Sequence, residues 1–76
     1  MRITYSPEVD AMRITFRKTT ITHTEELEDG VLADYDGEER IVGLEILDAS
    51  EKIDHPEAME YIVYTPDMVA APGSAA

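Results

Sequence analysis

The chain has 76 residues, of which 6 are Lys or Arg and 17 are Asp or Glu, so its formal net charge is −11 at pH 7. This acidity argues against nucleic-acid or anionic-membrane partners, because phosphates are bound by Lys and Arg. With no cysteine and no apolar run of the roughly 20 residues that a membrane span needs, we expect a soluble cytoplasmic protein without disulfides or thiolate metal sites.

The first two predicted strands form a hairpin. Residues 2–5 alternate polar and apolar side chains, and Pro7 ends the strand because it has no amide proton to donate. Residues 6–10 have the composition of a turn. In residues 11–17 apolar side chains alternate with basic or hydroxyl ones, which is the period of a half-buried strand.

The second half of the predicted sheet is more apolar. Residues 18–28 are rich in Thr and Glu and predict one short edge strand at best. The turn pair Asp29 and Gly30 precedes a strand at 31–35. Residues 40–48 then form a nearly continuous apolar run, typical of a central strand, and a hairpin joins these two strands.

The sequence pattern changes after the last strand. Residues 49–53 favour a helical turn, and Asp54 has the spacing of a capping box that would begin a second short helix. Residues 61–65 also fit a short strand, so the pattern leaves open whether 54–65 is helix or strand. We expect one β-rich domain at 1–65 and a flexible tail at 66–76.

The predicted fold is mainly β (α+β), a small antiparallel β-meander of about four strands with a short C-terminal helix and a flexible tail. Its inner face would hold Ile3, Tyr5, Met12, Ile14, Phe16, Val31, Ala33, Tyr35, Val42, Leu44 and Ile46. Its outer face would place Arg2, Arg13 and Arg17 beside Asp34, Asp36 and Glu45. Opposite charges on neighbouring strands stabilise a sheet, so the arginines have a structural role in this prediction.

No pattern in the sequence indicates a catalytic residue, a cofactor site or a metal site. Asp34, Asp36, Glu38 and Glu45 have part of the spacing of a calcium loop, but Glu39 stands where that loop needs glycine, so we interpret them as a solvated hairpin. The two histidines, His23 and His55, lie far apart in sequence. We expect both at the surface beside carboxylates such as Glu25 and Glu57, and not in a shared zinc site.

Glu45 interrupts an otherwise apolar run. If buried and unpaired it would be a candidate site residue, and a small ligand-binding protein or enzyme using Glu45, Asp34 and Tyr35 is a minor alternative. Pairing of Glu45 with Arg13 or Arg17 is the favoured interpretation. Gly43 marks a close backbone approach or a bulge in the same strand.

The negative charge is unevenly distributed. Residues 1–18 carry a net charge of +2 and residues 19–76 a net charge of −13. An acidic surface suits a basic protein partner, and so small a domain without disulfides favours a homo-oligomer, with a dimer preferred. A structural homo-oligomer without activity is the alternative. The candidate partner surface consists of Glu25, Glu26, Glu28, Asp34, Asp36, Glu38, Glu39, Glu57 and Glu60.

Several segments together resemble one known family. They are Ile3-Thr4-Tyr5, Pro7-Glu8-x-Asp10-Ala11, Glu25-Glu26-Leu27-Glu28-Asp29-Gly30-Val31 with Asp34-Tyr35-Asp36, and Ile41-Val42-Gly43-Leu44-Glu45-Ile46-Leu47-Asp48-Ala49-Ser50. This combination resembles the small prokaryotic family called domain of unknown function 2283, over about residues 2–53. Arg13 departs from the family, which often has an aromatic residue there. The resemblance implies a compact β-rich domain with no assigned activity, cofactor or catalytic residue. Family gene neighbourhoods imply an antitoxin-like partner of a small basic protein.

Overall fold

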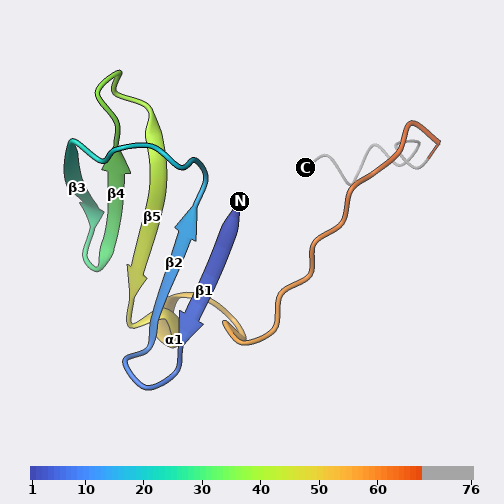
Figure 1. Ribbon diagram of the computed structural model, residues 1–76. Coiled ribbons are helices and arrows are strands. Elements are labelled where there is room, and N and C mark those ends of the chain that lie inside the picture. The colour runs from blue at the N-terminus through green and yellow to red at the C-terminus, as the bar shows by residue number, and fades with distance from the viewer. Residues whose placement is uncertain (68–76) are drawn as a thin grey trace.

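A computed structural model describes residues 1–67 and shows one antiparallel sheet followed by a short helix (Figure 1). The strands are β1 (Arg2–Ser6), β2 (Ala11–Thr15), β3 (His23–Glu28), β4 (Val31–Tyr35) and β5 (Ile41–Leu47), and the helix is α1 (Ala49–Lys52). The predicted fold class is therefore confirmed. The sheet has five strands, because the Thr- and Glu-rich segment does form the edge strand β3.

The strand order differs from that of a simple meander. It is β1-β2-β5-β4-β3, so β5 lies between β2 and β4. After β2, residues 16–22 cross one end of the sheet to reach its far edge (Figure 1). Three strand spacings are about 14 Å, and seven extended residues span up to about 23 Å, so this connection is long enough. Two hairpins then bring β5 back against β2.

The register separates an apolar face from a polar face, as the alternation predicts. Ile14 lies opposite both Ile3 and Leu44, and Leu44 lies opposite Ala33. Two residues further along β2 on the same face, Met12 lies between Tyr5 and Ile46, and Ile46 is also paired with Val31. Arg13 and Glu45 lie directly opposite each other on the other face, which confirms the predicted placement of this charge pair.

Nothing in residues 1–67 forms a second layer over the apolar face. In residues 1–67, every substantial contact between elements joins neighbouring strands, and α1 lies at one end of the sheet and not over it (Figure 1). The buried apolar side chains are few, namely Met12, Ala33, Val42 and Ala49. Most other residues of this face are only half-buried. A sheet normally buries its apolar face against another element, and no element of residues 1–67 covers this one.

The chain after α1 forms neither of the predicted elements. No second helix begins at Asp54, and residues 54–65 contain neither helix nor strand. A single turn, in which the amide of Ala58 donates to the carbonyl of His55, stands where the capping box predicted a helix. The tail expected from residue 66 falls almost entirely outside the described residues. Within those residues, we find no helix with the length and apolar character of a membrane span.

Candidate functional site

The polar face centres on an ion pair that bridges two strands which are not neighbours. Arg13 on β2 donates from Nη2 to Oδ2 of Asp34 on β4 at 2.6 Å, across the intervening strand β5. Thr24 on β3 donates from Oγ1 to the other Asp34 oxygen, also at 2.6 Å. Glu45 lies 3.9 Å from Nη1 of the same arginine. The predicted pairing of Glu45 with Arg13 is confirmed, although Asp34 is the closer partner.

Gly43 lies on the intervening strand β5, where it is opposite both Thr15 and Asp34. A Cβ there would lie 2.9 Å from the carbonyl oxygen of Ile14 and 3.6 Å from Oδ2 of Asp34. The close backbone approach predicted for this glycine is confirmed, and its cause is the contact between β5 and β2.

A second buried carboxylate organises the turn between β4 and β5. Asp36 accepts hydrogen bonds from the backbone amides of Glu38 and Arg40, at 2.8 and 3.0 Å, and from Nε of Arg40 at 3.0 Å. The pKa of Asp36 is lowered, chiefly by the Arg40 amide, with the Glu38 amide and the Arg40 side chain adding to the effect against the cost of burial. Asp36 therefore acts as a structural clamp for this turn.

A third carboxylate ties the first hairpin to α1. Asp10 accepts hydrogen bonds from the Ser50 hydroxyl at 2.6 Å, the Ser50 amide at 2.9 Å and the Tyr5 hydroxyl at 2.7 Å. These bonds lower the pKa of Asp10, with the Ser50 hydroxyl contributing most, and the bond to Asp10 raises the pKa of Tyr5. Sequence analysis missed this contact, because 40 residues separate Asp10 from Ser50 and only the fold brings them together.

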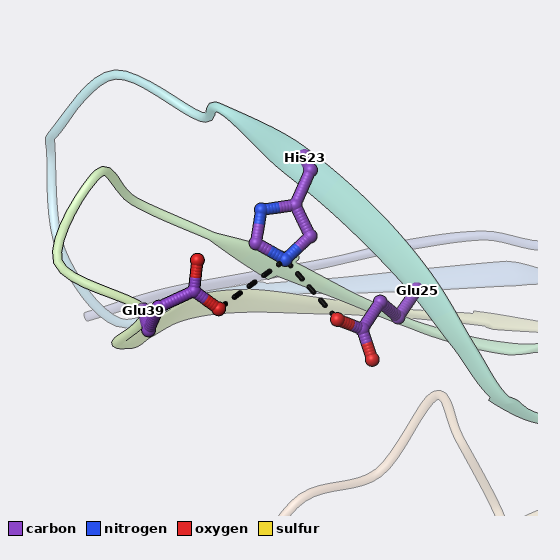
Figure 2. Close-up of side chains that lie close together, drawn as sticks. All are labelled: His23, Glu25 and Glu39. Atoms are coloured by element: carbon purple, nitrogen blue, oxygen red, sulfur yellow. Dashed lines mark hydrogen bonds and ion pairs between the residues drawn. The ribbon is translucent and has the colours of Figure 1, made fainter.

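On the apolar face, His23 lies between two carboxylates at the β3 edge (Figure 2). Its Nε2 is 3.1 Å from Oε2 of Glu25 and 3.7 Å from Oε2 of Glu39. The ring stacks on Tyr35, with the centroids 4.9 Å apart and the planes 8° from parallel. The predicted contact between His23 and Glu25 is confirmed.

His23, Glu25 and Glu39 are the group, among the described residues, that could hold a metal ion. Their nearest ligand atoms lie within 4.8 Å of one another, and imidazole and carboxylate are ligands of divalent metals. All three are at least partly exposed, however, and the hydrogen-bond contact of His23 with Glu25 explains the approach of these two side chains without a ligand. His55 does not belong to this group.

The structure changes the composition of the candidate partner surface. Asp34 and Asp36 are only 6% and 3% exposed and are held by hydrogen bonds within the chain, so they are not part of an accessible surface. The remaining members are all exposed on β3, on the β4–β5 turn and in the segment after α1, namely Glu25, Glu26, Glu28, Glu38, Glu39, Glu57 and Glu60.

The residues of the minor ligand-site alternative do not converge. Asp34 and Glu45 flank Arg13 on the polar face, whereas Tyr35 lies on the other face against His23. Glu45 is also partly exposed and paired, so it lacks the buried, unpaired environment that would make it a candidate acid or base. The most unusual surface is instead the uncovered apolar face, which sequence analysis did not recognise as uncovered because it could not show which elements pack together.

Comparison with known proteins identifies the family. The family model described as "Protein of unknown function (DUF2283)" matches residues 2–50, which contain all five strands. The search of curated proteins gave no match, and the search of solved structures gave none either. Since the match covers more than half of the 76 residues, the chain belongs to the DUF2283 family.

Proposed function

We propose that this protein is an acidic protein-binding module without catalytic activity, whose partner is a small basic protein that carries an apolar patch. The observation that supports this proposal is the uncovered apolar face of a single-layer sheet. Five strands at about 4.8 Å spacing and five residues at about 3.3 Å rise give a face of roughly 400 Å², of which the half-buried side chains leave only part accessible. The largest apolar patch on the surface of a monomer is often functional.

The charges explain why the partner would be basic. Glu25 and Glu28 on the edge strand β3 lie opposite Ala33 and Val31 of this face, Glu26 lies on the other face of β3, and Glu38 and Glu39 extend the negative charge onto the β4–β5 turn. Attraction between complementary fields accelerates encounter, and apolar burial of about 25 cal/mol per Å² then holds the complex. The antitoxin-like role implied by the family resemblance is the specific biological form of this proposal.

A structural homo-oligomer is the second candidate, and the same uncovered face favours it. A second copy could cover the face and satisfy the need for a second layer. The net charge of −11 on each chain opposes this pairing, whereas a basic partner would be attracted. Sedimentation of the isolated chain at several concentrations separates the two candidates: a monomer leaves the face free for a different protein, and a stable dimer supports the homo-oligomer.

The proposal predicts a small basic protein encoded beside this chain's gene, and that protein is the probe. Growth should be inhibited when the neighbour is expressed alone and restored by co-expression of this chain, and normal growth with the neighbour alone would contradict the antitoxin form. Association of the purified pair should slow about tenfold at low salt when Glu25, Glu26 and Glu28 are all changed to Gln.

A matched control changes three other exposed carboxylates, Glu8→Gln, Glu51→Gln and Asp54→Asn, and so removes the same total charge. We expect its association rate to stay within about twofold of the wild type, because these residues lie outside the β3 edge. Equal slowing in both triple variants would show that only the net charge matters. Absence of a complex with the wild-type chain would contradict the binding function itself.

A further inference from the structure

Among residues 1–67, no strand lies beside the outer edge of β1. β1 is the terminal strand of the sheet, so one side of its backbone presents amides and carbonyls that β2 does not use. A free edge of this kind readily pairs with any extended segment that fits it. The nearest such segment in the described part of the chain follows α1.

Two side chains of this segment lie near the β1 edge. Met59 and Tyr61 line a groove of about 440 Å³ together with Met1 and Ile3. Further along, the charge of Glu57 acts on Tyr5 and contributes to the raised pKa of its hydroxyl. β1 runs toward α1 and the segment after α1 runs back in the opposite direction, which is the direction of an antiparallel strand (Figure 1). No backbone hydrogen bond joins residues 59–65 to β1 in the described chain.

One antiparallel register suits these neighbours. It places Ile3 opposite Met59 and Met1 opposite Tyr61, and the same offset places Tyr5 opposite Glu57. We propose that residues 57–61 dock on the outer edge of β1 as a sixth antiparallel strand, with Ile3 opposite Met59 and Arg2 opposite Glu60. The β1 edge is thus an interaction surface, and its occupant is this chain's own segment.

The side chains fit this register on both faces. Met59 and Tyr61 join Ile3 on the apolar face, where they extend a surface that β1 otherwise terminates. On the polar face Glu60 meets Arg2, an opposite-charge pair of the kind that stabilises neighbouring strands. Any shift by one residue would turn Met59 and Tyr61 to the polar face.

The composition of the segment supports a strand. Residues 59–64 include Met, Ile, Val and two Tyr, and Pro occurs only outside them, at 56 and 66. Their apolar side chains are between 49% and 70% exposed, so they have no apolar surroundings in the undocked position. Docking would remove part of this surface from water and pair backbone groups that now face solvent.

Cross-linking tests the register directly, because the chain has no cysteine of its own. Two double variants place cysteines opposite each other, namely Thr4→Cys with Ala58→Cys and Ile3→Cys with Met59→Cys. Alternate pairs of an antiparallel ladder are close enough for a disulfide, so at least one of these neighbouring pairs should oxidise readily within a single chain. The control, Thr4→Cys with Met59→Cys, places the two thiols on opposite faces and should oxidise at least tenfold more slowly.

Equal rates in all three variants would overturn the proposal, and so would cross-links that join two chains, since the segment would then dock on a second copy. A charge reversal gives an independent measurement. Arg2→Glu should expose the β1 amides to faster hydrogen exchange, and adding Glu60→Arg should restore their protection. Failure of the second change to rescue the first would also contradict the proposed register.

Discussion

Removal of the Arg13 side chain tests whether the bridge over Gly43 stabilises the sheet. Arg13→Leu keeps the apolar stem but deletes the partner of Asp34, whose side chain is 9% exposed. The carboxylate would then keep only its hydrogen bond from Thr24. A hydrogen bond between charged groups contributes about 1.5–3 kcal/mol. The arginine side chain is 40% exposed, which places the expected loss near the lower end, at about 1.5–2 kcal/mol.

Urea unfolding followed by circular dichroism measures this loss. For so small a chain the dependence on denaturant is roughly 1 kcal/mol per molar, so the midpoint should fall by about 1.5–2 M. Arg17→Leu is the control, because it removes the same charge from an exposed position just beyond β2. A midpoint for Arg13→Leu within about 0.5 M of the control would refute the reasoning, since net charge alone would then account for the effect.

Three further predictions concern Gly43, the acid range and Ser50. Gly43→Ala should destabilise by about 1–3 kcal/mol because its Cβ would press on the Ile14 carbonyl, whereas Gly37→Ala, whose Cβ meets only Thr22 at 3.8 Å, should be nearly neutral in the same urea assay. Because the pKa values of Asp10 and Asp36 are lowered by folding, the stability they contribute is complete above their ordinary value of 3.8 and is lost as the pH falls through the folded values. Unfolding between pH 5 and pH 2 should show this loss, and a smaller loss in Asp36→Asn; equal acid sensitivity in that variant would contradict it. Ser50→Ala should raise the pKa of Asp10 toward 3.8 in an NMR titration, and an unchanged pKa would exclude the Ser50 hydroxyl as its main cause.

The sequence predicted the strands better than their order. Alternation over residues 11–17 identifies β2 because each face of a strand has its own solvent environment. The same logic placed Arg13 and Glu45 on one face. The order could not be derived, because both a meander and the observed insertion of β5 satisfy the same hydrophobic pattern. What distinguishes them is the path of residues 16–22, which carries no such pattern.

The candidate site was less predictable, since it depends on contacts between distant residues. Asp34 and Asp36 have the same sequence character as exposed carboxylates, and only Arg13 across β5 and the amides of the β4–β5 turn explain their burial. After α1, the capping-box spacing at Asp54 was misleading. The β-favouring residues at 62–64 oppose a helix, and the structure has only a single turn at residues 55–58.

The central claim is that a basic protein partner covers the apolar face of the sheet. Methyl NMR of the chain, titrated with the small basic partner that the proposal predicts, tests this claim most directly. We predict that the largest changes occur at Ile14, Leu44 and Ile46 in the middle of that face, with the methyl groups of Thr19 and Thr20 in the connection between β2 and β3 unchanged. A complex that forms while the methyl groups of this face stay unchanged would contradict the account.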